Sequence, residues 1–493
     1  MALFSCDEIE SPIPEAEVLP ELTAGTADFS NYVSIGASFT AGFTDNALFI
    51  AGQENSFPNT LSKQFAKIGG GNFSQPLMND NVGGLLIGGA TNERFLPRLY
   101  FNGIGPVTLD ASSTTEATNV QPGPFNNMGI PGAKSFHLLF DGYGNPGNLA
   151  TATANPYFVR IASSPTTTVL QDAMAQSPTF FTLSEIGAND VLGYAISGGD
   201  GTNPITPVDG AVGIGFNATF TALINTLTSN NAKGVVTNLA YITDLPHFTT
   251  VPHNAIPLDE ATAAQLNFAF SAYNQGLQDT LDAISAGLIP STLAPDFDQE
   301  EVDKRQISFS AGQNAVLILD ENLSDLSAIN AGLTNMRQAT AEDLLVLPAS
   351  SFIGTEAIPG NPLTVNGVAV PLADKWVLTP EEQKEIKDTI DAYNVTIEAI
   401  ASSNDNIALV DLNAILSEVS STGANFDGFN LASNLVTGGA ISLDGIHPNA
   451  RGYAYMANKF LEAIDAKFGS NFIASGNVAK ANDFPTNYSP ALQ

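Results

Sequence analysis

The sequence predicts an α/β fold in which a parallel central sheet carries helices on both faces. Short apolar segments rich in β-branched and aromatic residues alternate along the chain with segments of helical periodicity. Strands that alternate with helices favour a parallel sheet, because each helix returns the chain to the same edge. The 493 residues are 44% hydrophobic, which is enough for a sizeable core.

The individual elements follow from local patterns. Strands are expected at 32–37, 179–187, 234–242 and 406–412. Helices are expected within 207–234, 257–287, 379–404 and 452–468. The helix at 379–404 opens with a capping box, in which Thr379 is the N-cap, Pro380 is the first helical residue and Glu382 is the third.

Two stretches do not fit a minimal α/β layout. Residues 46–125 are rich in Gly, Asn and Pro, and residues 290–375 contain a predicted hairpin that turns at Asn366-Gly367. Both are expected to be insertions that form a lid or rim over the functional site. The first has apolar residues for the underside of such a lid: Phe49, Ile50, Phe57, Leu85, Leu86 and Ile87.

The expected domain organisation has three parts. Residues 1–30 are acidic and Pro-rich, which is typical of a disordered tether, residues 31–470 form the main domain with its insertions, and residues 471–493 are a C-terminal extension.

The charge balance excludes some partners. Asp and Glu number 50 and Lys and Arg 17, so the net charge is −33. Such a surface repels phosphate backbones and anionic lipid, so neither nucleic acid nor direct membrane adsorption is expected. No apolar stretch is long enough to span a bilayer.

The single cysteine, Cys6, lies in "LFSCDEIE", which resembles the lipobox of bacterial lipoproteins. The resemblance implies a lipid anchor at Cys6 and an extracytoplasmic, outer-membrane or cell-surface location. A basic and apolar signal peptide does not precede this motif, so either the start is truncated or the motif is accidental.

Four short motifs carry polar residues that suit nucleophilic catalysis. "GASFTAG" places Ser38 after the first predicted strand, and "NNMGIPGAKS" places Gly132 in a turn. "IGAND" places Asn189 after the next strand, and "SLDGIHPNARGY" places Asp444 three residues before His447. Loops at the carboxyl ends of parallel strands meet in one crevice, so we expect these residues to converge.

The residue types match one reaction. Serine becomes nucleophilic when a histidine takes its proton, and a carboxylate orients that histidine. Ser38, His447 and Asp444 therefore form a candidate triad. The oxyanion donors are expected to be the N–H of Ser38, the N–H of Gly132 and the side-chain amide of Asn189, with Gly129 as an alternative to Gly132.

Together the four motifs, in this order, resemble those of the SGNH (GDSL-type) hydrolase family. The resemblance implies a flavodoxin-like α/β/α sandwich that hydrolyses carboxylic esters, with Ser38 as nucleophile, Gly132 and Asn189 in the oxyanion hole, and Asp444 and His447 completing the triad. The chain departs from the family in the first block, where Ala37 stands in place of Asp.

We expect no cofactor and no metal. Of the remaining histidines, His137 is expected to pack in a helix, and His247 and His253 to lie exposed or at the substrate rim, because carboxylates at metal-ligand spacing do not flank them. The predicted function is a serine ester hydrolase for a lipid or medium-chain acyl ester. A carbohydrate acetylesterase, a non-enzymatic surface binding protein and a metal-dependent hydrolase are the alternatives.

Overall fold

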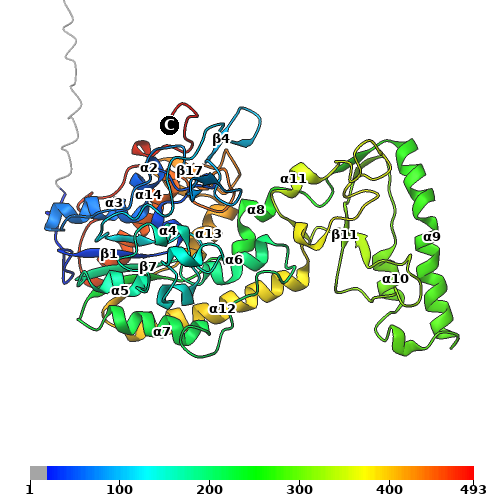
Figure 1. Ribbon diagram of the computed structural model, residues 1–493, viewed down its shortest axis with the longest axis horizontal. Coiled ribbons are helices and arrows are strands. Elements are labelled where there is room, and N and C mark those ends of the chain that lie inside the picture. Colours follow the sequence, from blue (N-terminus) through cyan, green and yellow to red (C-terminus); the bar gives the residue numbers. More distant parts are fainter. Residues whose placement is uncertain (1–18) are drawn as a thin grey trace, which may run out of the picture.

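A computed structural model describes residues 19–493 and is built around a five-stranded parallel sheet (Figure 1). The order is β6-β1-β7-β8-β15, and every neighbouring pair is parallel. The strands are β1 (Tyr32–Gly36), β6 (Asn127–Gly129), β7 (Phe180–Ser184), β8 (Lys233–Thr237) and β15 (Ile407–Val410). The prediction of a parallel α/β fold is confirmed, whereas Cys6 lies outside the described residues.

One face of the sheet is covered by α3 (Phe57–Phe65) and α14 (Ala450–Phe468). The ring of Phe57 stacks on that of Phe460, with 4.7 Å between centroids. Helix α3 falls inside the first expected insertion but belongs to the layer that covers the sheet. The prediction that Phe57 lines a lid is therefore wrong.

The other face is covered by α5 (Val169–Met174), α7 (Phe216–Leu227) and α12 (Pro380–Ser403). Phe216 stacks on Tyr393 with 3.9 Å between ring centroids, which joins α7 to α12. The capping box of α12 is confirmed, because the Thr379 N–H donates to Glu382 Oε2 at 2.7 Å.

The loops at the carboxyl edge of the sheet carry short elements. Between β1 and β6 lie α1 (Ser38–Ala41), α2 (Ile50–Glu54), β2 (Leu86–Ile87), β3 (Ala90–Thr91), β4 (Leu99–Phe101) and β5 (Pro106–Thr108). Elsewhere lie α4 (Pro156–Val159), α6 (Ala188–Ile196), α8 (Pro246–Thr249), α11 (Ala349–Phe352), α13 (Leu412–Ser421), β13 (Leu344–Leu345), β14 (Val377–Leu378), β16 (Ala424–Phe426) and β17 (Phe429–Leu431).

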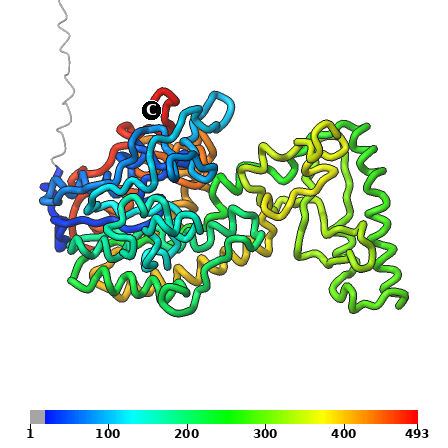
Figure 2. Tube along the Cα trace, viewed as in Figure 1, coloured from blue at the N-terminus to red at the C-terminus, as the bar shows by residue number. Residues whose placement is uncertain are grey.

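Residues 256–338 form a lobe that projects from the main body (Figures 1 and 2). It contains β9 (Ile256–Leu258), α9 (Glu260–Ser285), α10 (Gln299–Arg305), β10 (Gly312–Asn314), β11 (Leu317–Leu319) and β12 (Met336–Gln338). It has a hydrophobic cluster of its own, built around Tyr273, Leu277 and Leu317. The lobe therefore includes the long helix α9 and begins before the expected insertion at 290–375.

The segment at 339–378 leads from the lobe back to α12. The hairpin expected there is wrong: Val365 makes an isolated bridge with Glu356, and Asn366 makes one with Val370. Gly367 does adopt the left-handed conformation, with φ +80°. The predicted turn at Asn366-Gly367 is therefore present, but the predicted strands on either side of it are not.

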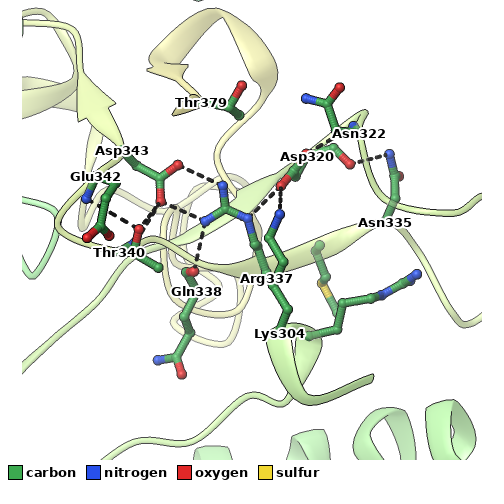
Figure 3. A network of polar contacts seen from close by, with 12 residues as sticks. Lys304, Asp320, Asn322, Asn335, Arg337, Gln338, Thr340, Glu342, Asp343 and Thr379 are labelled. Atoms are coloured by element: carbon green, nitrogen blue, oxygen red, sulfur yellow. Dashed lines mark hydrogen bonds and ion pairs between the residues drawn. The ribbon is translucent and has the colours of Figure 1, made fainter. Parts of the chain in front are cut away.

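A buried arginine fastens the lobe to this returning segment (Figure 3). Arg337 Nε lies 2.5 Å from Asp320 Oδ2, and its two terminal nitrogens lie 2.6 and 2.7 Å from the carboxylate of Asp343. Lys304 Nζ approaches Asp320 at 3.5 Å. Two cations thus balance two carboxylates, which is what burial of charge requires.

Both described chain ends pack on the body. Phe29 is buried against Phe65, and the Thr26 N–H donates to Phe468 O at 2.8 Å. The prediction of a disordered tether over residues 1–30 is therefore wrong for Thr26 and Phe29, which pack on the body. At the other end, fully buried Arg98 donates to the carbonyls of Tyr488, Ser489 and Leu492. Among residues 19–493, none of the helices is long and apolar enough to cross a bilayer.

Candidate active site

Ser38 occupies the first position of α1, directly after the central strand β1. β1 lies between β6 and β7 in the sheet, so the loops after these three strands leave from one edge. These loops carry Ser38, Gly132 and Asn189, as the strand order requires. Ser38 itself is 8% exposed.

A carboxylate from the neighbouring strand supports the turn that carries Ser38. Glu185 Oε1 accepts the N–H groups of Ala37 at 2.7 Å and Thr40 at 3.0 Å, and Oε2 accepts the Thr40 hydroxyl at 3.1 Å. Burial raises the pKa of Glu185 to about 7, although these hydrogen bonds favour the charged form. Glu185 was not among the predicted site residues; its one signal in the sequence is that it is a lone acid in the apolar segment "FFTLSEIG".

Asp444 and His447 lie in the loop before α14 and form a hydrogen-bonded pair. Asp444 Oδ2 is 2.9 Å from His447 Nδ1, and Oδ1 accepts the N–H groups of Ile446 and His447 at 2.8 and 2.9 Å. Burial opposes the charge of Asp444, but the charge of His447 and these hydrogen bonds hold its pKa below the usual range. The Asn46 N–H also donates to Asp444, at 2.8 Å.

Aromatic contacts bring this pair to the segment that carries Ser38. The ring centroid of His447 lies 5.7 Å from that of Phe39 and 4.7 Å from that of Phe43. The hydroxyl of Tyr453 on α14 donates to the carbonyl of Phe43 at 2.6 Å. Within the described chain, Ser38 Oγ and His447 Nε2 are not hydrogen-bonded to each other. Such contacts commonly tighten when substrate binds.

The surroundings of the two candidate glycines differ. The Gly129 N–H donates to Asn127 Oδ1 at 3.0 Å, and a Cβ at Gly129 would lie 2.2 Å from Ala41 N. Gly132 has φ +80°, a Cβ there would meet nothing closer than 4.0 Å, and its N–H has no hydrogen-bond acceptor among residues 19–493. Gly129 thus serves close packing of β6 on α1, and Gly132 has the N–H that is free to bind an oxyanion.

Asn189 and Asp190 hold the Gly132 loop against α6. Asn189 Nδ2 donates one hydrogen to Ala133 O at 3.0 Å, which leaves the second amide hydrogen available. Buried Asp190 accepts the N–H of Ser135 at 2.8 Å and its hydroxyl at 2.7 Å. The two loops are therefore fixed relative to each other.

Two cavities adjoin these residues. One of about 720 Å³ is lined by Asp444 and His447, by Asn46 and Leu99 of the first insertion, and by Leu347 of the second. The other, of about 110 Å³, is almost entirely apolar. Its lining includes Phe39, Glu185, Ala188, Leu416, Ile441 and Met456. It therefore borders the neighbours of Ser38 and Asn189.

The remaining histidines differ from one another. His137 packs as expected, with its ring stacked on Tyr143 at 4.3 Å. His247 is 7% exposed, so the expectation that it is solvent-exposed is wrong, although it does line the larger cavity. Neither ring nitrogen of His247 has a hydrogen-bond partner among the described residues, and burial lowers its pKa to about 4. His253 is partly buried.

Comparisons of the chain with protein-family models, with curated proteins and with solved structures find no match.

Proposed function

We propose that this protein is a serine ester hydrolase in which Ser38 attacks an ester carbonyl and is acylated. His447 accepts the Ser38 proton and returns it to the leaving alcohol, and Asp444 holds the imidazole in the required tautomer. The N–H groups of Ser38 and Gly132 and the amide of Asn189 bind the oxyanion. Water then deacylates Ser38, with His447 as the base.

The observation that carries this proposal is the 2.9 Å contact between Asp444 and His447, placed by Phe39 and Phe43 beside the segment that begins with Ser38. The strand order also supports it. When the five strands are renumbered along the chain, β6-β1-β7-β8-β15 becomes 2-1-3-4-5, the flavodoxin-like order. That is the order implied by the resemblance to SGNH hydrolases.

The two cavities favour an acyl ester with a short to medium chain. The apolar cavity of about 110 Å³ suits a hydrocarbon tail, since each buried methylene contributes about 0.8 kcal/mol. The wider cavity beside His447 is where the leaving alcohol would depart.

The lining of the wider cavity also favours a second candidate, a carbohydrate acetylesterase. The polar residues Thr250, Ser350 and Ser351 line this space of about 720 Å³, which is large enough for a sugar. The two candidates differ in the chain length that they prefer.

Turnover of p-nitrophenyl esters from acetate to palmitate, and of acetylated polysaccharides, tests both. Wild-type protein should hydrolyse an ester and should be labelled by a fluorophosphonate, and Ser38→Ala should do neither. Ser402→Ala is the matched control, because Ser402 is an exposed serine of α12 that lines neither cavity, and this variant should remain active. An active Ser38→Ala variant would overturn the proposal. A rate that peaks at acetate would select the acetylesterase.

We also propose that Cys6 carries a lipid anchor, on the strength of the "LFSC" motif. Mass spectrometry of protein isolated from its host should find Cys6 as an acylated first residue. Unmodified Cys6 that still follows Ser5 would exclude this.

A further inference from the structure

Three carboxylates meet where the lobe joins the main body. Glu321 follows β11 in the lobe, Asp374 begins a short helical turn before β14, and Glu382 lies in the first turn of α12. One oxygen from each lies within 4.8 Å of the others. Two stretches that are distant in the sequence, one at Glu321 and one at 374–382, therefore direct negative charge at one point.

The most buried member of this group is incompletely satisfied. Glu382 is 4% exposed, and its Oε2 accepts the N–H and hydroxyl of Thr379. Its Oε1 is buried and has no hydrogen-bond partner, and the same is true of Asp374 Oδ1, within residues 19–493. Burial of a carboxylate oxygen without a hydrogen-bond partner destabilises the folded state. A bound ligand would satisfy both of these atoms.

The loop after α6 passes close to Glu382 Oε1 but donates no hydrogen bond to it in the described part of the chain. Gly199, in the loop after α6, has φ +77°, and a Cβ there would lie 1.8 Å from this oxygen. The N–H groups of Gly198 and Gly199 donate instead to the carbonyls of Ala195 and Tyr194. Gly199 thus lets the loop pass close to the Glu382 carboxylate, and Gly198 lets it pass close to the Asp374 carbonyl, without donating to either carboxylate.

The neighbouring network shows how this protein otherwise balances buried acids. Asp320 and Asp343 are matched by Arg337 and Lys304 (Figure 3). Glu321, which follows Asp320 directly, has no such counterpart. In the described part of the chain, no Lys, Arg or His nitrogen lies within 4.0 Å of Glu321, Asp374 or Glu382.

We propose that Glu321, Asp374 and Glu382 bind a calcium ion, which ties the lobe and its returning segment to α12. Ligands at about 2.3–2.6 Å from Ca²⁺ are separated by at most about twice that distance, which matches the observed spacing. The donors are all carboxylate oxygens, which favours a hard cation over zinc. Oxygen ligands from irregular segments favour Ca²⁺ over Mg²⁺, which needs near-ideal octahedral geometry.

Calorimetry tests this directly on the full chain. Protein freed of metal with EDTA and desalted is titrated with CaCl₂, and in parallel its Tm is measured with CaCl₂ or MgCl₂. We expect one Ca²⁺ per chain, a rise in Tm of roughly 2 °C near saturation, and much weaker binding of Mg²⁺. The absence of both heat and a Tm shift would overturn the proposal. The repulsion between the carboxylates would then be relieved by a proton that they share.

Variants locate the site. Glu321→Gln changes an exposed residue and should weaken Ca²⁺ binding at least about tenfold, since it removes one of three charged ligands. Asp374→Asn and Glu382→Gln should do the same, and Gln at position 382 can retain the capping box. Glu381→Gln is the matched control: it removes one charge from the same turn of α12, on an exposed residue outside the group, and should bind normally. Wild-type affinity in Glu321→Gln and Asp374→Asn, or an equal loss in Glu381→Gln, would overturn the assignment.

Discussion

The carboxylate of Glu185 accepts the N–H of Ala37 at 2.7 Å, one residue before Ser38. An acid that directly follows β7 thereby supports the turn that joins β1 to Ser38. Glu185 is a positioning residue in the proposed mechanism, because it reaches Ser38 only through the backbone.

Glu185→Ala should lower kcat far more than Glu185→Gln. The Gln side chain can still accept the N–H groups of Ala37 and Thr40, and the Thr40 hydroxyl can rotate to accept from its amide. Ala leaves the buried N–H groups unpaired, at a cost of about 1–3 kcal/mol each. Steady-state kinetics on a p-nitrophenyl ester would check this; equal losses in the two variants would contradict it.

The pH dependence of stability should also change in Glu185→Gln. In the wild type the pKa of Glu185 rises from 4.5 to about 7 on folding, because the carboxyl group is buried. Between these values the folded state holds a proton that the unfolded state has lost, so the free energy of unfolding falls as pH rises. Urea denaturation from pH 5 to 8 should show the wild type losing stability relative to Glu185→Gln across this window. A constant difference would mean that Glu185 keeps its ordinary pKa.

Asn189→Ala should lower kcat by about 10²–10³-fold with little change in KM, if its free amide hydrogen binds the oxyanion. The Ala133 carbonyl would lose its partner in the same variant, so the melting temperature should be measured alongside. An effect confined to KM would instead make Asn189 a substrate-binding residue.

Asp444→Asn should lower kcat by about 10⁴-fold, because an amide favours the wrong tautomer of His447. Fluorophosphonate labelling of Ser38 should slow in parallel. Rapid labelling in this variant would show that Asp444 is not needed to activate Ser38.

Leu416→Trp should shorten the preferred acyl chain, because Leu416 lines the apolar cavity of about 110 Å³ and the larger side chain would fill it. The ratio of kcat/KM for hexanoate to that for acetate should fall. Val395→Trp, on the exposed face of α12, is the control and should keep the wild-type ratio. An unchanged ratio in Leu416→Trp would show that the acyl chain does not bind in this cavity.

Arg337→Met should lower the free energy of unfolding by about 3–5 kcal/mol, because it leaves the buried carboxylate of Asp343 without a cation and that of Asp320 with Lys304 alone. Urea denaturation followed by circular dichroism measures the loss. Lys384→Met removes an exposed partner of Asp388 and should change little. Similar small effects in both variants would show that the buried network is not stabilising.

The sequence was informative where structure is set locally. The four predicted strands, the capping box of α12 and the positions of Ser38 and Asn189 just after β1 and β7 all follow from short-range patterns. Features that depend on distant packing could not be read in this way. Helix α9 has the periodicity of any amphipathic helix, and only the cluster around Tyr273 assigns it to the lobe.

The same limit explains the errors at the site. Phe57 had the composition expected of a lid residue, but its partner is Phe460, some four hundred positions along the chain. Glu185 was overlooked because its role depends on β7 lying next to β1. Gly132 was already favoured over Gly129 by the sequence motif, and the hydrogen bond from the Gly129 N–H to Asn127 is consistent with that choice.

Helix α14 and the carbonyls bound by Arg98 lie far from Ser38 in the sequence. The time at which they are synthesised therefore determines when the proposed site can be complete. Ser38 is synthesised early, whereas His447 and the residues whose carbonyls bind Arg98 are synthesised some four hundred or more residues later. At about 5–20 residues per second, roughly 20–80 s separate the synthesis of Ser38 from that of His447. The lobe, with its own hydrophobic cluster, can fold during that interval. In the proposed mechanism the nascent chain therefore lacks a complete triad until translation has passed His447 and α14 has packed on the sheet.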